Sequence, residues 1–190
     1  MIIDHDVPAR TFPFLLRTPK GPFSTDEIFK HLQKQGKFCG KRILVEGEPG
    51  YGKSTLCNKM AFTWGSECSE HCTSQPCIHQ VKILIYLRAS DLRNHTTVGS
   101  AVHKHLPPDG FEVSCEDVDR VLGSSDNMIL IDAYDEGYKD NPLLQKLIER
   151  KVLNDATVLV TSRPGYIDSL LDKFDGPTFV VAAFTDEQKS

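Results

Sequence analysis

Five short runs of apolar residues, separated by longer and more polar stretches, dominate the pattern of this chain. None of the runs alternates apolar with polar residues, so each is expected to be buried on both faces, as the strands of a parallel sheet are. The predicted strands are residues 43–45, 83–87, 128–131, 158–160 and 179–181.

The stretches between the runs predict helices. Strands that alternate with helices predict an α/β fold, in which a five-stranded parallel sheet is the middle layer of a three-layer sandwich with right-handed crossovers. The predicted helices are residues 53–64, 98–106, 115–123, 142–153 and 165–173.

The two ends of the chain differ from this pattern. Residues 1–22 contain four prolines and no periodicity, which predicts an irregular lead-in. Ser24 and Glu27 have the spacing of a capping box and predict a short helix to about Gln35. From Thr185 the sequence has the cap and first turn of another helix, so we expect a fragment of a larger protein rather than a short natural product.

The composition indicates an ordinary domain with nearly balanced charge. The chain has 190 residues, with 22 Lys and Arg against 26 Asp and Glu, and a formal net charge of -4. Such a length suits one domain. The apolar runs are far shorter than the roughly 20 residues that span a bilayer, so no membrane association is expected. Direct nucleic-acid binding is not expected either, because it needs clustered positive charge.

A glycine-rich segment lies between the first predicted strand and the first predicted helix, and it fits the pattern G-x-x-x-x-G-K-[ST]. Glycines allow backbone N–H groups to surround a phosphate, Lys53 would reach the β- and γ-phosphates, and Ser54 would bind Mg²⁺. The alternative is a glycine-rich turn without a ligand. The candidate nucleotide-binding residues are Gly47, Glu48, Pro49, Gly50, Tyr51, Gly52, Lys53, Ser54 and Thr55.

Three acids follow the third predicted strand. Asp132 ends the apolar run, which places its carboxylate at the carboxyl edge of the sheet, where it would bind Mg²⁺ directly or through water. Asp135 or Glu136 would orient or deprotonate the attacking water, and the sequence does not choose between them. The alternative is a turn that carries solvated acids.

An arginine follows the fourth predicted strand, in the segment Thr-Ser-Arg-Pro. Because this position lies at the same edge of the sheet, Arg163 would reach the γ-phosphate and join Asp135 and Glu136 as a candidate catalytic residue. A plain surface arginine is the alternative.

Together these segments resemble the NACHT domain, the nucleotide-binding module of the STAND class of P-loop NTPases in NOD-like receptors. Residues 47–55 look like its Walker A motif, residues 129–136 like its extended Walker B motif, and residues 158–164 like its sensor 1. On this resemblance residues 23–190 form a NACHT-like domain that is truncated at its C-terminus.

The resemblance implies ATP or ADP with Mg²⁺ as ligands and a switch that controls oligomerisation of a larger, innate-immune type of receptor through self-association. It further implies weak ATPase activity in the full-length protein and the strand order 5-1-4-3-2. One departure is Ala133, where the family usually has glycine. If this position needs a positive φ, the added methyl group would shift the local geometry.

Other functions and sites stay open. A small-substrate kinase or a GTPase is one alternative, although no guanine-recognition element is present, and a nucleotide-bound scaffold without hydrolysis is another. The tract Cys68–His79 could bind zinc, but its spacing fits no standard finger, so a variable loop is preferred. ATP use and reduced thiols indicate a cytoplasmic protein. Four basic residues are expected to form a solvated connection: Lys34, Lys37, Lys41 and Arg42.

Overall fold

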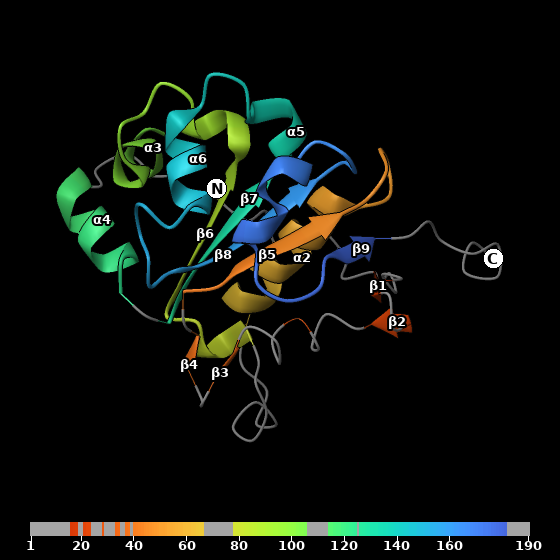
Figure 1. The fold of residues 1–190 in the computed structure, drawn as a ribbon. Coiled ribbons are helices and arrows are strands. Elements are labelled where there is room, and N and C mark those ends of the chain that lie inside the picture. Colours follow the sequence, from red (N-terminus) through yellow and green to blue (C-terminus); the bar gives the residue numbers. More distant parts are fainter. Residues whose placement is uncertain are drawn as a thin grey trace.

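The centre of the protein is a parallel sheet of five strands, seen in a computed structural model that describes residues 16–18, 21–23, 28, 33–34, 37–38, 40–66, 78–105, 114–124 and 126–181. The strands lie in the order β9-β5-β8-β7-β6, which is the predicted order 5-1-4-3-2 (Figure 1). Each predicted apolar run forms one of them, so the α/β fold is confirmed. The strands are β5 (Arg42–Glu46), β6 (Ile83–Arg88), β7 (Asn127–Asp132), β8 (Thr157–Ser162) and β9 (Phe179–Val181).

Two antiparallel strands extend the sheet beyond β9. The strand β1 (Leu16–Thr18) pairs with β9 on one side and with β2 (Gly21–Phe23) on the other. The prediction of an irregular segment over residues 1–22 is therefore wrong for these residues. Among the described strands β2 is the edge of the sheet, and Pro22 lies in it, which suits a residue without a backbone N–H group.

The predicted helix to Gln35 is also wrong at its end. Ile28 is helical, as expected, and fully buried. Further on, β3 (Gln33–Lys34) and β4 (Lys37–Phe38) pair as antiparallel strands.

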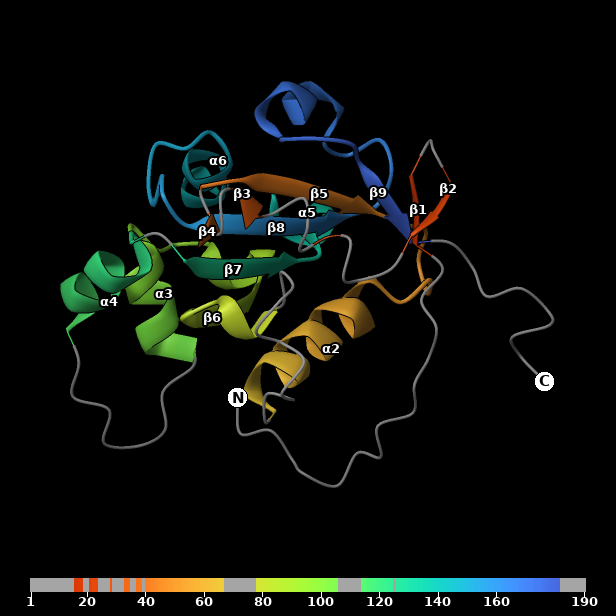
Figure 2. The same ribbon diagram turned by 90° about the horizontal axis from the view of Figure 1, so that it is seen from below.

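Helices cover both faces of the sheet. The helix α2 (Lys53–Gly65) packs Leu56 and Met60 against one face, together with Leu130 and Leu159 of the strands. The helices α3 (Val98–His105) and α6 (Pro142–Ile148) cover the other face, and α4 (Cys115–Leu122) packs against α3. Figure 2 shows α2 below the sheet and α6 above it. Successive strand residues alternate between the two cores, which is why the apolar runs are continuous.

Three helical segments differ from their predictions. The helix α6 ends at Ile148 rather than at residue 153. The Leu147 carbonyl oxygen accepts a hydrogen bond from Arg42 Nε, and the chain leaves the helical conformation at Arg150, where φ is positive. The segment predicted over 165–173 is a 3-10 helix, η4 (Asp168–Lys173). A short helix, α5 (Tyr134–Gly137), was not predicted.

The described residues contain no helix long and apolar enough to cross a membrane. Among the same residues, no group of three or more His, Cys, Asp and Glu side chains is arranged to hold a metal ion. Most of the Cys68–His79 tract and the helix predicted from Thr185 lie outside the described residues.

Candidate functional site

The glycine-rich segment forms the connection from β5 to α2, and its glycines are required by geometry. Gly50 and Gly52 have φ values of +80° and +96°, which side-chain-bearing residues rarely adopt. The N–H of Gly47 donates to Ser162 O over 3.1 Å and ties the loop to β8. A Cβ atom at Gly47 would lie 3.0 Å from Val181 O, so the backbones approach closely there.

The first turn of α2 presents positive charge to the loop. Lys53 Nζ donates to the carbonyl oxygens of Gly47 and Glu48, over 2.6 and 3.1 Å. No side chain caps this end of α2, and its first turn contains no acidic residue. Ser54 and Thr55 are exposed on the same turn. A helix start with free N–H groups and a nearby lysine favours a bound anion.

Asp132 ends β7 with its carboxylate fixed by two hydroxyl groups. Its Oδ1 accepts a hydrogen bond from Thr161 Oγ1 over 2.5 Å, and its Oδ2 accepts one from Tyr86 Oη over 3.2 Å. The residue is only 3% exposed. Burial, followed by the charge of Asp132, raises the pKa of Tyr86, which keeps its phenol group a donor. Both hydroxyl partners come from neighbouring strands of the sheet.

Neither Tyr86 nor Thr161 was among the predicted site residues. Each lies near the end of a predicted strand, and Thr161 also lies in the segment that resembles sensor 1; these positions were the signal in the sequence. A hydroxyl group at a strand end can serve packing or a site equally well. The partner across the sheet decides between these roles, and strand order was needed to identify it.

Ala133 follows Asp132 with φ 56° and ψ 55°, which is the left-handed region. The departure from glycine therefore falls at a position that does need a positive φ. An L-residue in this conformation costs about 1 kcal/mol. The N–H of Ala133 donates to Thr161 Oγ1 over 3.0 Å, so the strained turn is fixed to the same hydroxyl group that binds Asp132.

The structure separates the two acids that the sequence left equivalent. Asp135 accepts from Arg163 twice, from Nε over 2.8 Å and from the backbone N–H over 3.1 Å, and its side chain is 4% exposed. Glu136 is 65% exposed and meets Arg163 Nη2 over 3.4 Å. Asp135 is therefore fixed by Arg163, whereas Glu136 is mostly exposed and has only one longer contact with it.

These residues surround one cleft of about 280 Å³ at the carboxyl ends of the strands, and α5 contributes Asp135 and Glu136 to it. Ser54 and Asp132 offer a hydroxyl and a carboxylate oxygen, the donor types that Mg²⁺ prefers, and the open space at Gly50 suits a phosphate. The residues present therefore fit a phosphate ligand with Mg²⁺. The cleft is lined by Pro49, Gly50, Gly52, Lys53, Ser54, Thr55, Asp132, Ala133, Asp135, Glu136 and Arg163.

Three of the predicted nucleotide-binding residues do not line the cleft, and each has another contact. Gly47 contacts β8 and β9, and Glu48 accepts from Lys53 through its carbonyl oxygen. Tyr51 packs its ring against the core on the α2 face. These three residues therefore support the conformation of the loop through contacts outside the cleft.

Comparison with known proteins gives two matches. The sequence profile of the NACHT domain matches residues 41–190, which is well over half of the chain. Human "Baculoviral IAP repeat-containing protein 1" is 26% identical over 160 residues, which cover 80% of this chain and 10% of that protein. The chain thus spans about a tenth of the length of this curated relative.

Proposed function

The chain belongs to the NACHT family of nucleotide-binding NTPase signalling modules, and we propose that it is an ATP/ADP-Mg²⁺ switch domain that controls oligomerisation of a larger receptor-like protein of innate-immune type. The observation that supports this function is the convergence of the Lys53 loop, three acids and Arg163 on one cleft. The proposal includes a cytoplasmic location, where ATP is abundant, and self-association through this domain.

In this proposal, different residues of the cleft bind the phosphate groups and Mg²⁺. The backbone N–H groups of the loop and the ammonium group of Lys53 bind the β- and γ-phosphates, and Thr55 adds a hydroxyl group near the α-phosphate. Ser54 would hold Mg²⁺, and so would Asp132, either directly or through water. When bound, Mg²⁺ neutralises phosphate charge. Thr161 and Tyr86 keep the carboxylate of Asp132 in one orientation, so little entropy is lost when the metal site forms.

Hydrolysis is slow in this proposal because the acids are engaged elsewhere. Glu136 orients a water molecule and accepts its proton while the water oxygen attacks the γ-phosphorus and the bond to the β–γ bridging oxygen breaks. The same carboxylate is attracted to Arg163, and Asp135 is fully engaged by it. Turnover therefore needs Arg163 to leave Glu136.

Arg163 distinguishes the two nucleotides. With ADP bound, the guanidinium keeps its ion pairs with Asp135 and Glu136. A γ-phosphate competes for the same guanidinium, because phosphate oxygens form strong charge-assisted hydrogen bonds with arginine. Release of the acids from Arg163 is the change that the domain transmits.

Calorimetric titration of the chain with Mg-ATP and Mg-ADP tests the binding. Lys53→Ala is expected to weaken both affinities by roughly tenfold or more, because a charge-assisted contact is lost. Lys104→Ala, on the exposed face of α3, is the matched control and should change neither affinity. If the wild-type chain binds neither nucleotide, and Lys53→Ala behaves like wild type, the proposal is wrong.

One observation favours a second candidate function, a nucleotide-bound scaffold that does not hydrolyse. Asp135 is already bound to Arg163 through both the side chain and the backbone. Single-turnover assays of Asp135→Asn and Glu136→Gln separate the two functions. The switch predicts that Glu136→Gln abolishes turnover and retains binding, whereas the scaffold predicts no turnover in the wild type although nucleotide raises its melting temperature.

A further inference from the structure

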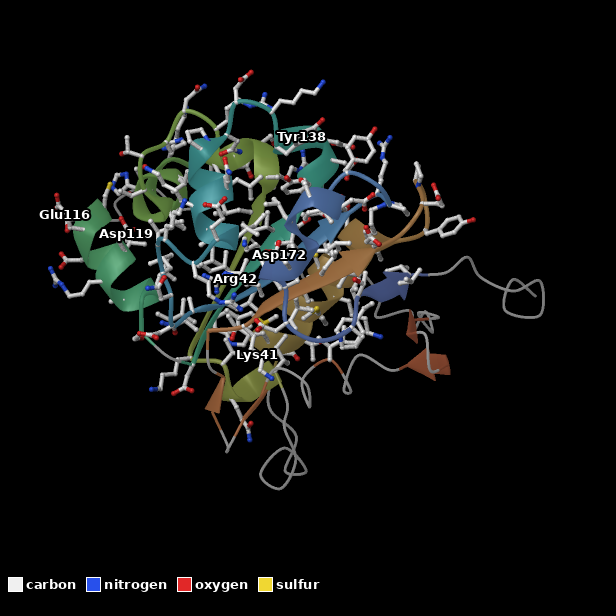
Figure 3. The ribbon with its side chains drawn as sticks, viewed as in Figure 1. Lys41, Arg42, Glu116, Asp119, Tyr138 and Asp172 are labelled. Atoms are coloured by element: carbon white, nitrogen blue, oxygen red, sulfur yellow. The ribbon has the colours of Figure 1, made fainter. Side chains whose placement is uncertain are left out.

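Three tyrosine rings connect the loop of the acids to the loop of Arg163. The rings of Tyr134 and Tyr138 stack with centroids 5.4 Å apart and an interplanar angle of 19°. Tyr138 then meets Tyr166 edge to face, with centroids 6.0 Å apart and an angle of 76°. Both distances lie in the range where aromatic pairs attract. Figure 3 labels Tyr138, the residue that directly follows α5.

The α5 end of this row is fixed. Tyr134 is 7% exposed and belongs to the core. Asn141 Nδ2 donates to Ala89 O over 2.8 Å and to Gly137 O over 2.9 Å, which joins α5 to the 3-10 helix η3 (Ala89–Leu92). A Cβ atom at Gly137 would lie 2.4 Å from Ser90 N, so the two segments are in direct contact.

The Arg163 end has fewer restraints. The chain is buried at Ser162 and again at Ile167, and it is exposed in between at Pro164, Gly165 and Tyr166. Gly165 has a φ of +83°, and Arg163 itself is 39% exposed. The ring contact of Tyr166 with Tyr138 therefore fixes the exposed segment against α5.

From this geometry we infer that Tyr138 is a positioning residue for Arg163. Its ring holds Tyr166, and thereby the segment after β8, at a constant distance from α5, so that the guanidinium faces the cleft after it leaves the acids. The inference rests on the proposed function and adds to it the residue that keeps ATP distinguishable from ADP. Within the described part of the structure the phenol group of Tyr138 makes no hydrogen bond, so the residue would act through the contacts of its ring with Tyr134 and Tyr166.

Affinities for Mg-ATP and Mg-ADP, measured by calorimetry on the chain, test this role. Tyr138→Leu is expected to lower the preference for ATP by roughly three- to tenfold, the amount that a lost aromatic pair costs. The affinity for ADP should stay unchanged. Tyr138→Phe should keep the wild-type preference, because the rings still meet. The exposed partner gives a second pair, Tyr166→Leu and Tyr166→Phe, whose folding does not depend on a core position.

Tyr138→Leu is also tested in a protein that already carries Arg163→Met, to separate an effect through Arg163 from a general loss of packing. In Arg163→Met, Tyr138→Leu should cause no further loss of preference, because Tyr138 acts through Arg163. The inference is overturned if both leucine variants keep the wild-type preference, if phenylalanine loses as much as leucine, or if the loss persists in the Arg163→Met background. It is also overturned if the wild type binds both nucleotides equally, although nucleotide binding would then stand. A wild type that binds neither nucleotide removes the proposed function and this inference together.

Discussion

Two arginines lie at opposite ends of the neighbouring parallel strands β5 and β8, Arg42 at the amino end of β5 and Arg163 just after the carboxyl end of β8. Arg42 begins β5 and is fully buried, and its guanidinium donates to the carbonyl oxygens of Leu147, Leu153 and Ala156 over 2.8, 3.2 and 2.7 Å. Arg163 follows β8, is 39% exposed and is paired with two carboxylates. The two side chains have the same chemistry and entirely different partners.

The difference lies in what the partners can do. Backbone carbonyls cannot leave Arg42 without a change in the segment that carries them, whereas the 39% exposed guanidinium of Arg163 can turn away from Asp135 and Glu136 without any change in the backbone. Burial, followed by the charge of Arg150, lowers the pKa of Arg42 to about 10, so Arg42 stays charged at neutral pH. At the amino ends of the strands, Arg42 is therefore held by backbone carbonyl groups. At the carboxyl ends, Arg163 is held by side-chain ion pairs, for which a phosphate group can compete.

The largest effect should come from exchanging each arginine for methionine. Arg42→Met leaves the carbonyl oxygens of Leu147, Leu153 and Ala156 without their guanidinium donor, and we expect a loss of about 3 kcal/mol or more in the free energy of unfolding. Arg163→Met should lose about 1 kcal/mol, since its ion pairs are half exposed. Urea denaturation measures both, and equal losses would erase the distinction between the two ends of the strands.

A smaller effect concerns backbone strain at the carboxyl edge. Ala133→Gly relieves the left-handed conformation and should raise the free energy of unfolding by about 0.5–1 kcal/mol, because glycine adopts this φ without steric cost. The matched control is Ala101→Gly within α3, which should lose about 1 kcal/mol. Thermal denaturation of the wild type and both variants measures these two changes in stability. If Ala133→Gly is as destabilising as its control, the turn carries no strain.

The smallest effect should come from Glu46, which ends the strand that Arg42 begins. Burial, followed by the charge of Asp168, raises the pKa of Glu46. The folded protein therefore holds this proton more tightly than the unfolded chain, and stability is lost as pH rises through the raised pKa. Glu46→Gln should remove that loss and gain about 0.5 kcal/mol at pH 7, since solvent screens a partly exposed group.

Melting temperatures between pH 4 and pH 8 test this dependence. The difference between Glu46→Gln and wild type should grow as the pH rises. A constant difference would show that the carboxylate is not disfavoured by folding.

The features that the sequence predicted well have local signals. The five strands were visible because each is a continuous apolar run, and the cleft loop because seven residues from Gly47 to Lys53 carry its geometry in their own composition. Strand order was implied by the family resemblance, and it places Asp132 and Arg163 at one edge. Local pattern and resemblance together therefore predicted the fold and most of the cleft.

The features that the sequence missed depend on distant partners. Arg42 was expected in a solvated basic stretch, and that prediction is wrong, because its acceptors lie more than a hundred positions later in the chain. The same reason hid the hydrogen bond between Tyr86 and Asp132, which joins two strands across the sheet. The difference between Asp135 and Glu136 needed the short helix α5, which turns one acid inward and the other outward.

The order of the strands also determines when the cleft can exist during synthesis. The strands β5 and β7 carry the phosphate loop and Asp132, yet they do not pair with each other, and β8 lies between them. Because β8 is made after both, a nascent chain that ends before Thr157 has two sheet edges without their shared neighbour. Such unpaired edges are prone to aggregate. A chain that ends before Thr157 therefore lacks the strand that places the phosphate loop and Asp132 side by side.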